Sequence, residues 1–136
     1  MKRTLSAILV SFLLVPAAAT AQSIGESEFM NSCASCHGVS GIGDGPLAGF
    51  LSGSLPNLTQ LAENNGGVFP VTMVYSTIDG TMTAGPHGTG EMPVWGNRYR
   101  VRGEQVANPD FSTDEAMVFA RFRILALTEY LAGIQQ

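Results

Sequence analysis

The stretch NSCASCHGVSG, residues 31–41, contains both cysteines of the 136-residue chain and one of its two histidines. Cys33, Cys36 and His37 fall within five consecutive positions, in the pattern C-x-x-C-H. Four kinds of structure bring these residue types together: a disulfide, a metal site, a redox-active dithiol and a covalent haem anchor. The rest of the sequence is needed to choose between them.

The start of the chain has the features of an export signal. Two basic residues precede an apolar run over 5–15, and Ala19-Thr20-Ala21 fits the small-x-small pattern of a cleavage site. We therefore expect residues 1–21 to be a cleaved signal peptide and residues 22–136 to form one small exported domain. The apolar run is shorter than the ~20 residues that span a bilayer, so we expect no stable membrane insertion after cleavage.

The charge of the expected mature domain bears on its partners. Without its leader the chain keeps eleven acidic residues, five arginines and no lysine, so its formal charge changes from −4 to −6. A nucleic-acid-binding protein needs a basic face, which this composition does not supply. We expect no nucleic-acid partner. An acidic domain suits a basic docking face on a protein partner, and the same charge also favours solubility.

Hydrophobic periodicity predicts an all-α fold of small helices joined by glycine-rich loops. A first helix is predicted over residues 23–34, with Phe29 and Met30 on its apolar side. A short helix is predicted after Pro56 and ends at the Asn64-Asn65-Gly66 stop signal. The glycine-rich stretches 38–49 and 81–96 are predicted as loops.

Two further helices are predicted in the second half of the chain. One begins at Pro70, which suits a first turn, and ends at Gly80. The last follows a capping box formed by Ser112 and Glu115. Its predicted apolar stripe consists of Met117, Ala120, Ile124, Leu127, Leu131 and Ile134. No stretch alternates convincingly enough to predict a sheet.

The chemistry of Cys33, Cys36 and His37 favours haem attachment. A disulfide between the two cysteines closes a tiny loop and would stabilise the fold little. A redox dithiol needs a βαβ setting, and a zinc site needs four ligands, for which the chain offers only His87 in addition. Haem attachment uses all three residues, because two thiols form thioethers and the histidine ligates the iron. The favoured cofactor is one covalently attached haem c, and a disulfide or redox dithiol is the alternative.

The second axial position of the iron decides between electron transfer and ligand chemistry. Three residues in the predicted loop over 81–96 are candidates to fill it: Met82, His87 and Met92. The methionines on predicted helices, Met30, Met73 and Met117, are interpreted as core residues. The residues alone leave the choice among the loop candidates open.

The motif GEMPVWG, residues 90–96, gives the sequence a family resemblance. Together with CASCH and the two terminal helices, it resembles the Met-Pro-x-Trp-Gly motif of class I bacterial cytochromes c. The resemblance implies that Met92 is the sixth ligand, opposite His37. It covers essentially all of the expected mature chain.

The same resemblance implies two packing features. Gly25 and Phe29 of the first helix match family positions that cross the last helix, where Leu127 and Tyr130 lie. Pro56 resembles the proline whose carbonyl accepts a hydrogen bond from the proximal histidine, which would fix the orientation of the imidazole.

Two residues after the motif are candidates for haem contacts. Trp95 is expected to cover the haem edge and donate its N–H to a propionate, or simply to pack in the core. Arg98, the first of three arginines over 98–102, is expected to pair with a propionate, or to lie on a solvated face.

The function that the resemblance implies is electron transfer rather than enzymatic catalysis. We expect a soluble, periplasmic, monohaem cytochrome c that carries single electrons between redox proteins, such as those of a respiratory chain. The first alternative is a haem subunit of a periplasmic dehydrogenase, docked through residues 97–109. The second is a ligand-binding sensor or peroxidase-like protein with an open iron position.

Overall fold

The computed structural model describes residues 23–81, 95–103, 110 and 112–136, and these ranges contain helices and no strand. The α-helices are α1 (Ile24–Ser32), α2 (Ala34–His37), α3 (Val71–Asp79), α4 (Trp95–Arg102) and α5 (Thr113–Gly133), and the 3₁₀ turns are η1 (Ala48–Phe50), η2 (Leu58–Gln60) and η3 (Glu63–Asn65). The all-α prediction is confirmed. The expected signal peptide and the ligand candidates Met82, His87 and Met92 lie outside the described residues.

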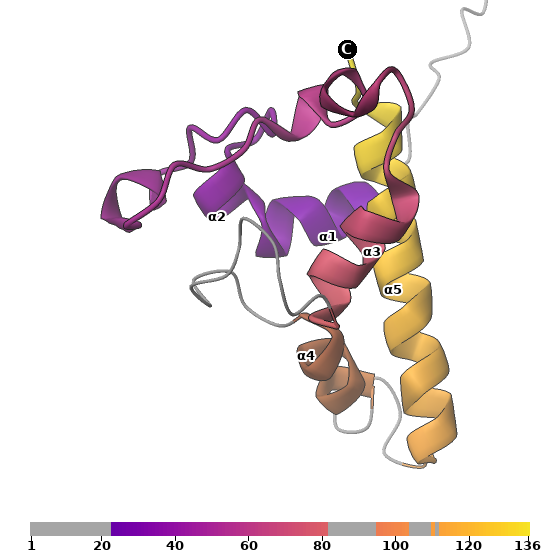
Figure 1. Cartoon of the computed structure of the whole chain (residues 1–136). Coiled ribbons are helices and arrows are strands. Elements are labelled where there is room, and N and C mark those ends of the chain that lie inside the picture. The colour runs from indigo at the N-terminus through magenta and orange to yellow at the C-terminus, as the bar shows by residue number, and fades with distance from the viewer. Residues whose placement is uncertain (1–22, 82–94, 104–109, 111) are drawn as a thin grey trace, which may run out of the picture.

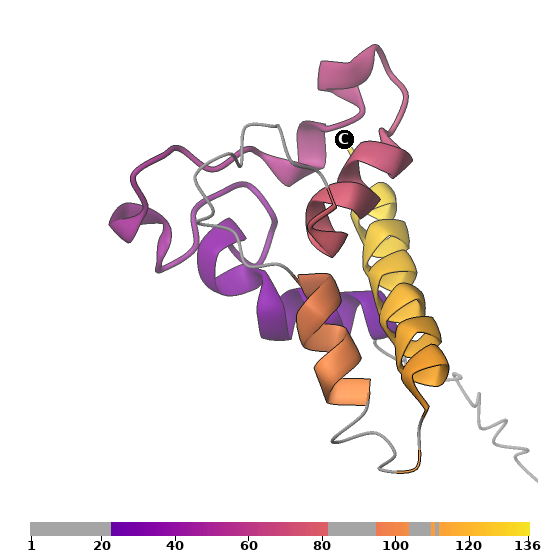
Figure 2. The ribbon, with the colours of Figure 1, turned by 60° about the horizontal axis from the view of Figure 1, so that its bottom comes forward.

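Helix α5 is the long element against which α1, α3 and α4 pack, as Figures 1 and 2 show. The closest contact is the crossing of α1 and α5. A Cβ atom on Gly25 would lie 2.0 Å from the carbonyl oxygen of Ala126, so only glycine allows the two backbones to come this close. Phe29 is fully buried, and its ring centroid lies 5.3 Å from that of Tyr130. The crossing that the family resemblance implies is therefore present.

The predicted stripe on α5 is largely correct. Ala120, Ile124, Leu127 and Leu131 are all buried. Met117 is 36 % exposed, however, and the fully buried residue in this turn is Ala116. A Cβ atom placed on Gly103, at the end of α4, would lie 3.5 Å from the Cβ of Ala116. The stripe begins one residue earlier than predicted because the close approach of α4 admits only a small side chain.

Helix α1 buries a polar residue in place of the expected methionine. Met30 is 37 % exposed, whereas Glu28 is 3 % exposed. The prediction that Met30 shares the buried face of Phe29 is wrong, because Met30 lies about 140° around the helix axis from Gly25, the residue at the crossing with α5. Gly25, Glu28 and Phe29 form the buried face of α1.

The predictions for the middle of the chain hold with one change. Helix α3 begins after Pro70 and ends at Gly80, whose φ of +82° caps the helix in the left-handed region. The segment after Pro56 forms two 3₁₀ turns rather than one helix, and Gly66 ends the second with a φ of +68°. Each turn is three residues long, which is normal for this geometry.

Helix α4 contradicts the loop prediction over 81–96 at its end, because the helix already begins at Trp95. Trp95 and Tyr99, one turn apart, are 6 % and 2 % exposed, and their ring centroids lie 6.2 Å apart. A Cβ atom on Gly96 would lie 2.6 Å from the backbone oxygen of Asp79, so α4 lies directly against the end of α3. The helix was not predicted because two aromatic residues among charged ones give too weak a periodic signal.

The predicted capping box at the start of α5 is present and makes stability depend on pH. The Ser112 backbone N–H donates to the Glu115 carboxylate over 2.9 Å, and the backbone N–H of Glu115 donates to the Ser112 hydroxyl. Hydrogen bonds from the Ser112 backbone, and then from its side chain, lower the pKa of Glu115. The charged carboxylate therefore stabilises the fold above its unfolded-state pKa, and this contribution is lost as the pH falls through the folded-state pKa.

We expect Glu115→Gln to be less stable than the wild type at neutral pH and equally stable in strong acid. Urea unfolding of both proteins at a series of pH values measures the difference. A difference in unfolding free energy that stayed constant down to low pH would contradict the assignment of this effect to the ionised carboxylate.

Candidate functional site

The C-x-x-C-H motif forms a tight turn at the end of α1. The carbonyl of Cys33 accepts hydrogen bonds from the backbone N–H groups of Cys36 (3.1 Å) and His37 (2.9 Å). Gly38, with a φ of +79°, ends the turn. Cys33 and His37 are therefore one helical turn apart and lie on the same side, where they are 8 % and 6 % exposed. Cys36 is partly exposed, and both thiols are free rather than joined as a disulfide.

Cys33 and His37 line a cavity of about 530 Å³, a volume that includes its open mouth. The remaining wall residues come from four parts of the fold: Phe29 of α1, Pro56, Leu58 and Leu61 of the middle segment, Met73, Val74, Thr77 and Ile78 of α3, and Leu127 and Leu131 of α5. Apolar side chains thus dominate the wall. A thiol and an imidazole on one side of an apolar cavity fit a large apolar group that is bonded through sulfur and ligated through nitrogen.

The glycine loop after the motif is fastened to the turn through backbone hydrogen bonds. The N–H groups of Gly43 and Gly45 donate to the carbonyls of His37 (2.8 Å) and Cys36 (3.1 Å). A Cβ atom on Gly45 would lie 2.5 Å from the oxygen of Cys36, so this close approach requires glycine. The loop therefore holds the positions of the two motif residues that follow Cys33.

The C-terminal end fastens another wall of the cavity. The Gln135 side chain donates to the carbonyl of Leu58 (2.8 Å) and accepts from the backbone N–H of Ala62 (2.9 Å). The backbone N–H of Gln136 donates to the carbonyl of Thr59 over 3.0 Å. Gln135 and Gln136, at the end of the chain, thus hold in place the segment that contributes Leu58 to the cavity wall.

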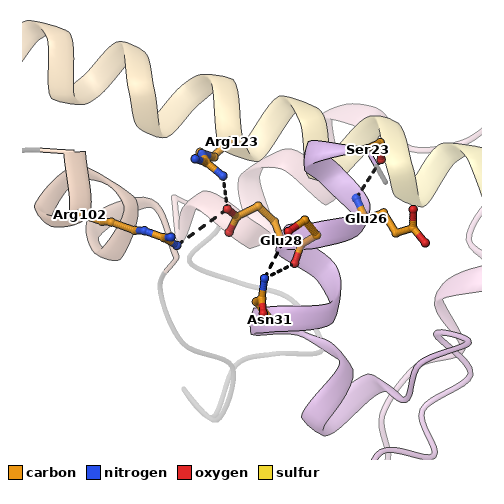
Figure 3. A network of polar contacts seen from close by, with 7 residues as sticks. Ser23, Glu26, Glu28, Asn31, Arg102 and Arg123 are labelled. Atoms are coloured by element: carbon orange, nitrogen blue, oxygen red, sulfur yellow. Dashed lines mark hydrogen bonds and ion pairs between the residues drawn. The ribbon is translucent and has the colours of Figure 1, made fainter. Parts of the chain in front are cut away.

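The electrostatics around Cys33 favour its neutral form. Burial, followed by the charges of Glu28 and Cys36, raises the pKa of Cys33 to about 12. Glu28 is itself paired with Arg123 of α5 and, over 3.9 Å, with Arg102 of α4, as Figure 3 shows. The thiol on the cavity wall therefore has a buried carboxylate as a close neighbour.

The other predicted site residues have different surroundings. Pro56 lines the cavity together with His37. Trp95 is buried in the core beside Tyr99, as its core-packing interpretation requires, and the guanidinium of Arg98 lies 4.9 Å from the centre of its ring. The propionate contacts of Trp95 and Arg98 remain predictions. Met92 lies outside the described residues.

Sequence reasoning missed two features of the site. Met73 is 41 % exposed rather than part of the core, because its side chain borders the cavity. Met73 and Thr77 are four residues apart and therefore share one face of α3, and this spacing was the sequence signal that could have placed Met73 beside the cavity. Glu28 follows Gly25 by three residues, which places it on the face that crosses α5, and this spacing could have identified it as a buried charge.

Comparison with known proteins identifies the family. The family model for cytochrome c matches residues 23–108, which includes the C-x-x-C-H turn and most of the cavity wall. The chain belongs to the cytochrome c family. Neither the search of curated proteins nor the search of solved structures found a match. Among the described residues, no helix of this cytochrome is long and apolar enough to cross a membrane.

The family membership establishes the cofactor and the general role. Cytochromes c hold covalently attached haem c, and the sulfur, imidazole and apolar wall residues of the cavity fit that group. The chain is accordingly a haem c-type electron-transfer protein.

Proposed function

We propose that this cytochrome is a periplasmic single-electron carrier of class I, with thioether bonds at Cys33 and Cys36 and with His37 and Met92 as axial ligands. Bound haem supplies an iron that gains and loses one electron. The observation that carries the proposal is the cavity wall, where Cys33 and His37 meet side chains that are otherwise almost entirely apolar. Within the described wall, no other side chain ionises, which suits electron transfer better than acid–base catalysis.

The surroundings of the haem favour a high potential. A methionine thioether stabilises ferrous iron, and the apolar wall disfavours the additional positive charge of ferric iron. Pro56 borders the same cavity as His37, in keeping with a role for its carbonyl in orienting the imidazole. The charge of −6 on the expected mature chain favours a redox partner with a basic docking face.

The test is an absorption spectrum of matured cytochrome, oxidised, then reduced, and finally exposed to carbon monoxide. We expect sharp reduced bands, the weak ferric band of a sulfur–iron bond, and no response to carbon monoxide, because both axial positions are filled. A ready shift with carbon monoxide would replace this proposal with a ligand-binding or peroxidase-like function.

A second candidate function is that of a haem subunit in a periplasmic dehydrogenase, and one observation favours it. The outer face of α5 exposes Val118 (64 %), Phe122 (54 %) and Leu125 (54 %), spaced four and three residues apart. Such an apolar stripe is typical of a face that packs on another chain. A molecular mass in periplasmic extract equal to that of the single chain would argue against this function.

A further inference from the structure

A buried carboxylate connects three helices close to the haem anchor. Glu28 of α1 is 3 % exposed and pairs through Oε1 with Arg123 of α5 and Arg102 of α4 (Figure 3). Its other oxygen, Oε2, and the hydroxyl of Tyr99 are both buried. Burial and then the charge of Glu28 raise the pKa of Tyr99, so the two groups are neighbours.

The cost of this arrangement argues for a role beyond stability. Burying a carboxylate requires removing its water, and the attraction to a buried partner often only offsets that cost. An apolar pair of similar volume would hold α1 and α5 together at least as well. The charge itself is therefore the property that needs an explanation.

The field of Glu28 reaches the cavity wall. Its charge acts on the thiol of Cys33, and the following residue, Phe29, lines the cavity. The charge of Glu28 is, after burial, a cause of the raised pKa of Cys33. The arginine side chains are 25 % and 51 % exposed, so water screens them more than it screens the carboxylate. The carboxylate therefore contributes a negative potential at the sulfur, which the two arginines offset in part.

We propose that Glu28 sets the midpoint potential of the haem: its buried negative charge favours ferric iron and lowers the potential, and Arg123 partly opposes it. The sign follows from the extra positive charge that ferric haem carries relative to ferrous haem. The inference rests on the proposed attachment of haem at Cys33, and it does not depend on which residue is the sixth ligand.

The experiment compares the midpoint potentials of haem-loaded variants by equilibration with a redox mediator. Glu28→Gln keeps the shape of the side chain and removes its charge, so we expect reduction to be favoured about threefold or more. Since tenfold corresponds to 59 mV for a one-electron couple, threefold is about 28 mV. Glu26→Gln is the matched control, because it removes the same charge from the same helix at a residue that points away from the cluster in Figure 3. Its shift should be several-fold smaller.

Variants of Arg123 distinguish an electrostatic effect of Glu28 from an effect of loosened packing. Loosened packing admits water to the haem and lowers the midpoint potential in any variant. The proposal instead requires the Glu28 and Arg123 variants to shift the midpoint potential in opposite directions. We expect Arg123→Gln to lower the potential and Arg123→Lys, which keeps the charge, to restore most of it. A potential in Glu28→Gln that is unchanged or lower than that of the wild type would overturn the proposal.

Two further comparisons keep the outcome decisive. If Glu28→Gln fails to accumulate, the double variant Glu28→Gln/Arg123→Gln leaves no unpaired buried charge, and it must have a higher potential than Arg123→Gln alone. Equal potentials would overturn the proposal. Carbon monoxide binding by the wild type would disprove only the proposed ligation, because the shift caused by Glu28 is measured whatever the sixth ligand is.

Discussion

Replacement of Met92 by alanine is expected to lower the midpoint potential by on the order of 100 mV and to let carbon monoxide bind the ferrous protein. The size is reasonable because axial ligands spread haem potentials over about 0.8 V. Under the proposed ligation, loss of the Met92 sulfur removes its stabilisation of ferrous iron and leaves one axial position open. Redox titration and the spectrum of the reduced protein under carbon monoxide measure the two effects.

Met73 provides the control for this experiment. Among the described residues, Met73 is the methionine on the cavity wall. Leucine has a similar volume, so Met73→Leu should preserve the wall and leave both the potential and the response to carbon monoxide nearly unchanged. If Met73→Leu opened the iron while Met92→Ala did not, the sixth ligand would be assigned to Met73.

Replacement of Gly25 by alanine is expected to destabilise the cytochrome by about 3 kcal/mol, at the upper end of the usual cost of overpacking. The new Cβ would lie 2.0 Å from the carbonyl oxygen of Ala126 and 2.8 Å from the Cβ of Tyr130, so α1 and α5 must separate. For a small domain this corresponds to a fall in Tm of roughly 10 to 20 °C. Thermal unfolding followed by circular dichroism measures it.

Gly133 supplies a matched control on the partner helix. A Cβ atom at this position would meet nothing within 4 Å. Alanine is favoured over glycine in a helix, so Gly133→Ala should leave the Tm unchanged or raise it slightly. Equal losses of stability in the two variants would show that the close crossing at Gly25 is not the cause.

The sequence was sufficient for those parts of the fold where local chemistry determines the structure. The capping box at Ser112 defines the start of α5, and Gly80 ends α3 because few other residues adopt a positive φ. The C-x-x-C-H turn could be interpreted because covalent and metal-ligand chemistry restrict residue types and spacing severely. Each of these signals is contained within a few consecutive positions.

The missed features depend on contacts between distant segments. Helix α4 is held by burial of Trp95 and Tyr99 and by the approach of Gly96 to Asp79, none of which has a local signature. The spacing from Gly25 could place Glu28 on the buried face, but the partner of its charge, Arg123, lies 95 positions away. Tertiary contacts of this kind override local propensity.

The construction of the cavity separates the anchoring of the cofactor from its enclosure. Both thiols and the imidazole that we propose to hold the haem lie within five consecutive residues, so a chain that has not yet folded already presents them side by side in sequence. The walls at Leu127 and Leu131, and the fastening at Gln135, come from the opposite end of the chain. Such long-range contacts form late, because closing a long loop costs entropy before any contact is gained. A covalent tether is thus what keeps the haem with its chain during the interval in which there is no pocket to hold it.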